Sequence, residues 1–406
     1  MSTSIPHRAI VFLSLAAFAS AATVRISDPL LPQLAVDFRV SLGEAAGVVT
    51  GFAAAYGLLQ AIYGPLGDRF GKYKLVLIGT LVSGATTASC ALAGSLVALT
   101  ALRIGAGATA AVIIPLSLAW IGDVVPYQNR QAMLARFMSG QVLGLVFGQI
   151  VGGVIGERFG WRMAFIGIAS VFLVAAAGLA SEFRANPATR LAPPAGPRES
   201  LGRAYLHSFD ILKRPWVRTI LVCVFMEGLA TFGAFAYVGG ALHARFGIGF
   251  GVVGALLGAY GVGGFLYTLI ARRLVPLIGE TGLAACGGAL ICASFIGLAV
   301  LSAWQQAAIP IFGIGLGFYM LHNTLQTNGT QMAPDARGVA MSFFAASFYI
   351  GQSVGVFAIS LVIDRTGAAP AFLTAAAIML ALGFALARAI RGRAGMADSI
   401  VRSTKI

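Results

Sequence analysis

Long apolar stretches, separated by short polar or Gly- and Pro-rich breaks, occupy almost the whole chain. A helix needs roughly 20 mostly apolar residues to cross the hydrocarbon core of a bilayer. About twelve such stretches are present, so the pattern predicts an all-α integral membrane protein with twelve transmembrane helices. The spans are expected near residues 9–31, 44–65, 74–94, 97–121, 131–156, 162–182, 217–240, 249–271, 278–302, 305–328, 337–363 and 368–390.

The composition excludes a soluble protein. Of the 406 residues, 58% are hydrophobic and 10% are charged, and the mean hydropathy is +0.87. A soluble domain carries about 25% charged residues, which this chain lacks. The four cysteines lie inside apolar stretches without C-x-x-C spacing. Neither a disulfide framework nor a metal site is therefore indicated, and no cofactor is expected.

The basic residues fall mainly on one side of the predicted spans. Cytoplasmic segments of membrane proteins are enriched in Lys and Arg. With both termini placed in the cytoplasm, 21 of the 28 Lys and Arg residues lie on the cytoplasmic side and five on the outer side, while Arg25 and Arg103 lie within spans. Both termini are therefore predicted to be cytoplasmic. This topology accounts for most of the net charge of +14, and no nucleic-acid partner is expected.

The first stretch also resembles a secretory signal peptide, with Arg8, an apolar run and small residues at 19–22. Its apolar character continues beyond that cleavage region, which favours an uncleaved span.

The longest connection divides the spans six and six. The predicted organisation is an N-terminal six-helix bundle at 1–182, a basic cytoplasmic linker at 183–216, a C-terminal six-helix bundle at 217–390 and a cytoplasmic tail at 391–406. The linker is rich in Pro and Arg, and a short surface helix is predicted around 201–212. A simple connector is favoured there over a membrane-binding role.

The two halves share a sequence pattern. Arg130 follows span four and Arg337 follows span ten, and each precedes an acidic residue, Glu157 or Asp364, by the same spacing. Between the basic and the acidic residue of each half lies a Gly-Gln-x-x-Gly element, which begins at Gly140 in the first half and at Gly351 in the second, displaced by four residues or about one helical turn. These matches predict two pseudo-symmetric bundles of parallel orientation, the arrangement expected of a transporter whose halves rock around a central site.

Between spans two and three the chain reads Gly64-Pro-Leu-Gly-Asp68-Arg69-Phe-Gly71-Lys72. This run resembles the G-x-L-x-D-R-x-G-[RK] loop signature of the major facilitator superfamily. With the spans, the linker and the repeat, the resemblance covers essentially the whole chain. It implies the major facilitator fold in a bacterial inner membrane, with this loop latching the two halves on the cytoplasmic side. Its glycines permit a tight turn, and Arg69 is expected to pair with a carboxylate such as Asp123.

Arg103 lies a few residues into span four. An arginine within a span is costly and usually faces a partner or a wet cavity. The alternative is that it snorkels to the interface. Its surroundings resemble the family's fourth-helix motif, in which the arginine is implicated in proton coupling.

Span five carries small residues along one face, which allows close helix packing. The spacing resembles the fifth-helix signature associated with antiporters, but that signature has Gly-Pro where this chain has Gly-Gln, which weakens the case for antiport. The glutamine of that pair, Gln149, either faces a cavity or forms a hydrogen bond with a neighbouring helix. The candidate residues of this motif are Gly144, Gly148, Gln149, Gly152 and Gly153.

Polar residues inside the spans are the best pointers to a transport site. Arg25 and Asp28 are three residues apart and share a helix face, so they form either a structural ion pair or part of a cavity wall. Pro29 and Pro32 are expected to bend or end the helix there.

Glu227 stands near the middle of span seven with no basic residue within one turn, which makes it the leading candidate for a proton carrier. The alternative is a protonated carboxyl that only bonds a neighbouring helix. In span ten, His322 and Gln326 share a face beside Asn323. His322 is a candidate for proton relay or for helix packing. Further candidates for polar and aromatic cavity walls are Tyr56, Gln60, Gln141, Tyr237, Tyr319, Tyr349 and Gln352.

No catalytic constellation and no nucleotide-binding loop is present. The sequence thus predicts a non-enzymatic secondary transporter, acting as a monomer, that resembles the twelve-span drug and solute efflux group and exchanges a small organic solute for protons. A proton-coupled importer or a facilitator of the same fold is the alternative. A membrane enzyme or a channel is a remote one.

Overall fold

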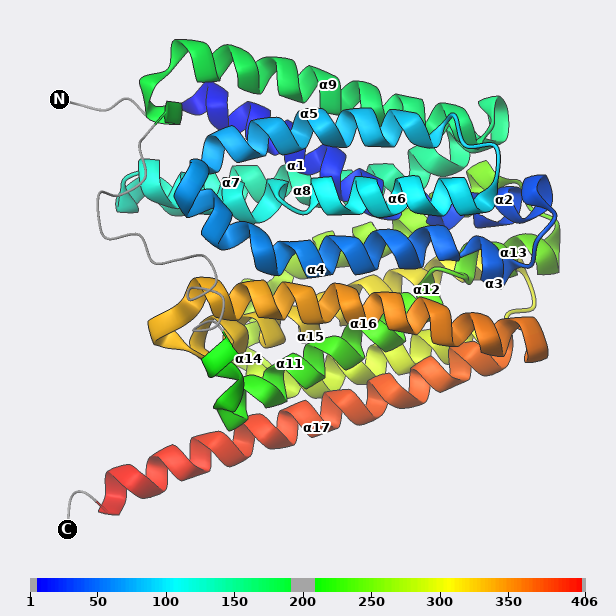
Figure 1. Cartoon of the computed structure of the whole chain (residues 1–406). Coiled ribbons are helices and arrows are strands. Elements are labelled where there is room, and N and C mark those ends of the chain that lie inside the picture. Colours follow the sequence, from blue (N-terminus) through cyan, green and yellow to red (C-terminus); the bar gives the residue numbers. More distant parts are fainter. Residues whose placement is uncertain (1–5, 191–208, 404–406) are drawn as a thin grey trace.

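The computed structural model describes residues 6–190 and 209–403, and this part of the chain is helical with no β-strand (Figure 1). The predicted all-α fold is therefore confirmed. The principal helices are α1 (His7–Arg25), α2 (Leu31–Phe38), α3 (Leu42–Ala45), α4 (Gly47–Phe70), α5 (Lys72–Cys90), α6 (Leu96–Ala110), α7 (Ile113–Val124), α8 (Tyr127–Phe159), α9 (Trp161–Ala185), α11 (Pro215–Glu227), α12 (Gly233–Phe235), α13 (Val238–Phe246), α14 (Phe250–Ala299), α15 (Ala308–Gln331), α16 (Arg337–Thr366) and α17 (Ala368–Ser403).

Ten stretches of the described chain are long and apolar enough to cross a membrane. One of them, α14, has 50 residues and contains two predicted spans, separated by the non-helical backbone of Gly279. Helix α5, which carries the predicted third span, is outside this set because it begins with two lysines and contains many Ser and Thr residues. The count of twelve spans stays a prediction.

Span one is interrupted where its prolines predict. Helix α1 ends at Arg25, a 3₁₀ turn follows at Asp28–Leu30, and α2 begins at Leu31. Proline lacks the backbone donor that a continuing helix needs. The break places Arg25 and Asp28 at the end of a helix, deep in the bundle.

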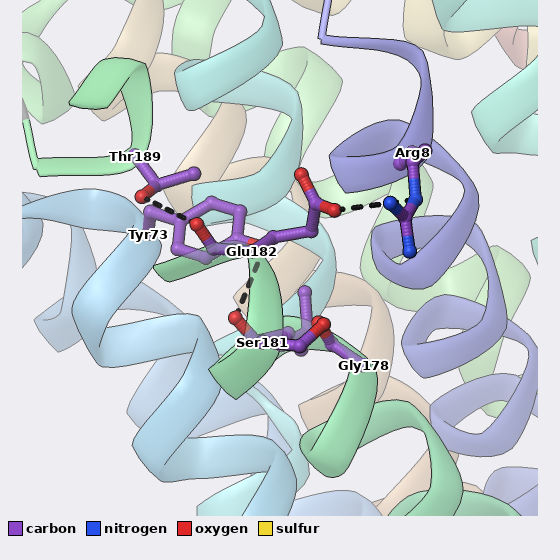
Figure 2. Close-up of polar contacts among 7 residues, drawn as sticks. Arg8, Tyr73, Gly178, Ser181, Glu182 and Thr189 are labelled. Carbon is purple, nitrogen blue, oxygen red and sulfur yellow. Dashed lines mark hydrogen bonds and ion pairs between the residues drawn. The ribbon is translucent and has the colours of Figure 1, made fainter. Parts of the chain in front are cut away.

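The helices of the two halves form two layers (Figure 1). One buried apolar core consists mostly of residues from α1–α9, and a second consists of residues from the second half. The predicted boundary at 183–216 stays a prediction, because residues 191–208, with most of the expected surface helix, lie outside the described residues. At the start of this connection, the Arg8 guanidinium lies 3.5 Å from the Glu182 carboxylate, and Thr189 bonds the Glu182 carbonyl (Figure 2). The first contact joins the beginning of α1 to the end of α9, and the second holds the turn at Pro187–Arg190 against α9.

Glycines on α8 bring it into backbone contact with α1. Gly144 lies against the carbonyl of Phe18, and Gly148 lies against that of Ala22, so a Cβ at either glycine would collide with backbone. Helix α16 packs on the second-half counterpart of α1 in the same way, with Gly351 against Phe225 and Gly355 against Leu229. Each second-half residue is shifted from its first-half counterpart by the same number of positions. The predicted repeat thus corresponds to a repeated helix contact.

Gly148→Ala is expected to lower the yield of folded protein and its melting temperature, because the added methyl forces α1 and α8 apart. Gly122→Ala in α7 is the matched control, since a Cβ there meets nothing within 4 Å. The control should be neutral or slightly stabilising, because alanine favours a helix by about 1 kcal/mol over glycine. Equal melting temperatures for the two variants in detergent would contradict this packing.

Candidate transport cavity

A cavity of about 1060 Å³ lies between the two halves. It reaches the surface among Gly64, Lys72 and Gly338, at the end of the bundle where α1 begins and α17 ends (Figure 1). We call this the terminal end. A cavity of this size accommodates a small organic solute. Residues from both halves line it, including Arg25, Tyr56, Gln60, Gln141, Phe232, Tyr260, Phe318, Tyr319, His322, Asn323, Gln326, Phe348 and Tyr349.

The opposite end of the bundle is closed by contacts between the halves. The Glu157 carboxylate at the end of α8 accepts a hydrogen bond of 2.6 Å from the Gly251 amide at the start of α14. In the other direction, Asp364 at the end of α16 accepts bonds from the Ser41 hydroxyl and the Gly43 amide at the start of α3. Nearby, Gly153 brings α8 against the backbone of α14. Across the described residues, the cavity therefore opens at the terminal end.

Arg25 forms part of the deep wall of the cavity. Its guanidinium carbon lies 3.6 Å from the centre of the Phe232 ring, and its Nη1 lies 3.5 Å from Asp28 Oδ2. Asp28 is fully buried behind it and does not line the cavity. Arg25 thus belongs both to the ion pair and to the cavity wall, whereas Asp28 belongs to the ion pair alone.

Arg103 lies inside the first half, away from the cavity. It is fully buried and donates hydrogen bonds to the carbonyls of Thr23 and Val48, which excludes the snorkelling alternative. Its guanidinium lies 4.1 Å from the centre of the Phe52 ring. Together with Arg25 and the buried amide of Gln149, it surrounds the Asp28 carboxylate.

Glu227 has a partner, although the sequence around it offers none. Its Oε2 lies 2.7 Å from Nδ1 of His322, which is on α15. Glu227 is fully buried, whereas His322 is partly exposed and lines the cavity beside Asn323 and Gln326. The sequence around Glu227 shows no partner because His322 comes from another helix, where no local sequence spacing reveals it. The pair connects the cavity to a buried carboxylate.

Aromatic rings hold His322 in place. Phe318 stacks on its ring at 4.8 Å, and Phe344 and Phe348 approach it edge-on. Immediately after Glu227 the helix widens into a π-helical turn, Gly228–Phe232, which ends at the ring under Arg25. Such turns occur frequently at functional sites.

Five of the seven further wall candidates line the cavity. Tyr237 and Gln352 are buried elsewhere in the fold, and Tyr237 bonds the Val356 carbonyl. Sequence reasoning missed Phe232 and Tyr260, because an aromatic residue inside a span looks the same whether it faces lipid or a cavity.

The glycine-rich run between spans two and three is mostly helical. Helix α4 continues to Phe70, and only Gly71, with φ of 93°, forms the turn into α5. Asp123 pairs with Lys72 at 2.7 Å and not with Arg69, because Lys72 begins the helix that packs beside α7. The side chain of Asp68 lies outside the described part of the structure, so its contribution to the loop that is expected to latch the two halves stays a prediction.

Comparison with known proteins agrees with this architecture. The family model described as Major Facilitator Superfamily matches residues 13–356. The chain is 27% identical over 336 residues to the uncharacterized MFS-type transporter YceJ of Bacillus subtilis strain 168, covering 81% of this chain and 82% of the relative. It is 25% identical over 376 residues to YwfA, another uncharacterized MFS-type transporter of that strain, covering 92% and 90%.

Among solved structures, a mutant form of the peptide transporter POT superposes with a TM-score of 0.78 at 16% identity, covering 95% of this chain and 94% of that one. At this identity the likeness concerns the fold alone. The helical bundle, its cavity between two halves and the family match lead to one conclusion: the chain belongs to the major facilitator superfamily and is a multi-pass membrane transporter, not an enzyme.

Proposed function

We propose that this chain moves a small organic solute through the central cavity by alternating access, and that it exports the solute in exchange for protons. The observation that carries the proposal is the 2.7 Å contact between Glu227 and His322 at the cavity wall. Ionisable groups inside membrane-spanning helices mark ion and substrate pathways. Because histidine titrates near physiological pH, such a pair can gain or lose a proton during a transport cycle.

The proposed cycle places the terminal end in the cytoplasm of a bacterial inner membrane, with the chain acting as a monomer. Solute enters from the cytoplasm and contacts His322, Asn323 and Gln326. The halves then rock to open the opposite end. A proton from outside binds the pair, weakens the contact between Glu227 and His322, and moves the imidazole within its aromatic stack. The solute leaves, and the proton is released to the cytoplasm after the return.

Proton-coupled import is the second candidate, and the charge of the cavity favours it. Arg25 lines the deep wall, and no carboxylate lies among the described lining residues. A proton added to the pair increases the positive charge of the site, so a negatively charged solute and a proton would bind together.

The test is transport by the purified chain in liposomes that contain a pH-sensitive dye and carry an inward proton gradient. Tetraphenylphosphonium, glucose, alanine and benzoate are offered one at a time, with protein-free liposomes as the control. We expect proton movement that depends on a transported solute. Movement opposite to the solute supports export by antiport, and movement with it supports import. Solute transport without proton movement contradicts proton coupling.

A further inference from the structure

The buried charges around span one do not balance. Arg25 and Arg103 both face the single carboxylate of Asp28. The other buried carboxylate of the central region, Glu227, already has His322 as its partner. When His322 is protonated against Glu227, the two guanidinium groups share the one negative charge of Asp28, and one positive charge has no carboxylate partner among the described residues. A buried charge without a partner is costly, so the site favours a compensating anion.

The uncompensated charge is accessible from the cavity only at Arg25. Arg103 donates hydrogen bonds from Nε and Nη2 to the carbonyls of Val48 and Thr23, its Nη1 is buried without a hydrogen-bond partner, and it lines no part of the cavity. In the described structure, the one polar contact of the Arg25 guanidinium is the 3.5 Å approach to Asp28. Its remaining N–H groups are free to bind a carboxylate in the planar, two-pronged geometry that arginine favours.

Three tyrosines line the cavity in the region of Arg25. Tyr260, Tyr319 and Tyr349 all line the cavity and lie close enough to Arg25 for its charge to act on them. The Phe232 ring, over which Arg25 lies, contacts Phe318 and Phe348 edge to face, and the rings of Phe318 and Phe348 pack against each other at a tilt, so the three form a continuous aromatic surface. One region of the cavity thus offers a cation with hydroxyl groups, and the adjoining region offers aromatic faces.

We propose that the transported solute is an amphipathic organic anion, whose carboxylate binds Arg25 and whose aromatic body packs on the phenylalanine surface. The proposal rests on the function proposed above only in taking the central cavity as the transport site. The proposal holds for both export and import of the solute. An anion bound beside a protonated pair agrees with the second candidate, in which solute and proton move together.

Three probes with the same body and different head groups test this proposal: naphthalene-2-carboxylate, naphthalene-2-carboxamide and naphthalen-2-ylmethylammonium. Their binding to the full chain in detergent is measured by calorimetry at constant pH. We expect the carboxylate to bind about tenfold or more tightly than the amide, as a charge-assisted bidentate contact allows. The ammonium should bind more weakly still. No proton gradient is present, so failure of proton coupling leaves this result unaffected.

Variants separate recognition from folding. Arg25→Gln should abolish the preference for the carboxylate, whereas Arg388→Gln, an exposed arginine away from the cavity, should retain it. Asp28→Asn releases Arg25 from its counter-ion and should tighten carboxylate binding, an effect that a purely structural role would not produce. Each variant is first checked for a single symmetric peak in size-exclusion chromatography. Equal binding of the three head groups, binding by none of them, or a preference for the ammonium overturns the proposal.

Discussion

Glu227→Gln is expected to abolish proton movement while leaving exchange of solute across the membrane intact. The substitution keeps the size of the side chain and its ability to bond His322, but it removes the group that holds the proton. A carrier that no longer binds the coupled ion can still rock between its two states when solute occupies the cavity. The measurement combines two assays on the same liposomes: solute-driven dye response, and counterflow of labelled solute without a gradient.

Glu280→Gln is the matched control, because Glu280 bonds Asn328 and does not line the cavity. It should leave both assays unchanged. A full dye response in Glu227→Gln would remove Glu227 from the proton path. Loss of counterflow together with the dye response would show that the pair is needed for the fold or for solute binding and not for coupling alone.

The combined variant Glu157→Gln and Asp364→Asn is expected to shift the protein toward a state that is open at the opposite end. These two carboxylates hold the first turns of α14 and α3 across the boundary between the halves. Hydrogen bonds to charged groups contribute about 1.5–3 kcal/mol when shielded, and exposed sites such as these contribute less. Roughly 1 kcal/mol from each gives a shift of about tenfold or more in the ratio of the two states.

Pulsed electron spin resonance measures this shift. Spin labels at Val36 and Val300 report the separation of the halves at the closed end, since both side chains are largely exposed. Labels at Val36 and Leu92 lie within one half and serve as the control. The background is Cys286→Ser, which removes the exposed cysteine. We expect a longer distance to gain population for the first pair only. Unchanged distances for both pairs would show that other contacts keep this end closed.

Much of the fold could be predicted because bilayer crossing imposes a length and a composition on every span. The break after Arg25 follows from Pro29 and Pro32 in the same way. The turn at Gly279 lies just after the break between the predicted spans at 249–271 and 278–302, where Arg272, Arg273 and Pro276 interrupt the apolar pattern. The sequence alone did not show how α5 accommodates its polar residues, because it is the packing of the bundle that buries several of its Ser and Thr residues.

The sequence identified individual residues of the site, but it did not show which of them lie next to each other in the fold. Glu227 and His322 each stand out as polar groups in apolar helices, but a single sequence does not show that α11 and α15 bring them to 2.7 Å. For the same reason, the sequence did not show that Asp123 forms its ion pair with Lys72 and not with Arg69. Arg25 was found from its position, whereas its aromatic partner Phe232 depends on a π-helical turn that the hydrophobic pattern does not predict.

The most direct test of proton coupling through the pair of Glu227 and His322 is the proton exchanged on solute binding. The purified chain in weakly buffered detergent solution is mixed with the solute that the liposome assay identifies, and a pH indicator records the change. We expect the number of protons exchanged to rise with solute concentration until it saturates, and we expect no exchange in Glu227→Gln. Release of protons on solute binding indicates antiport, and uptake indicates import. Solute binding with no proton change, or the same change in Glu227→Gln, would contradict the proposed role of the pair.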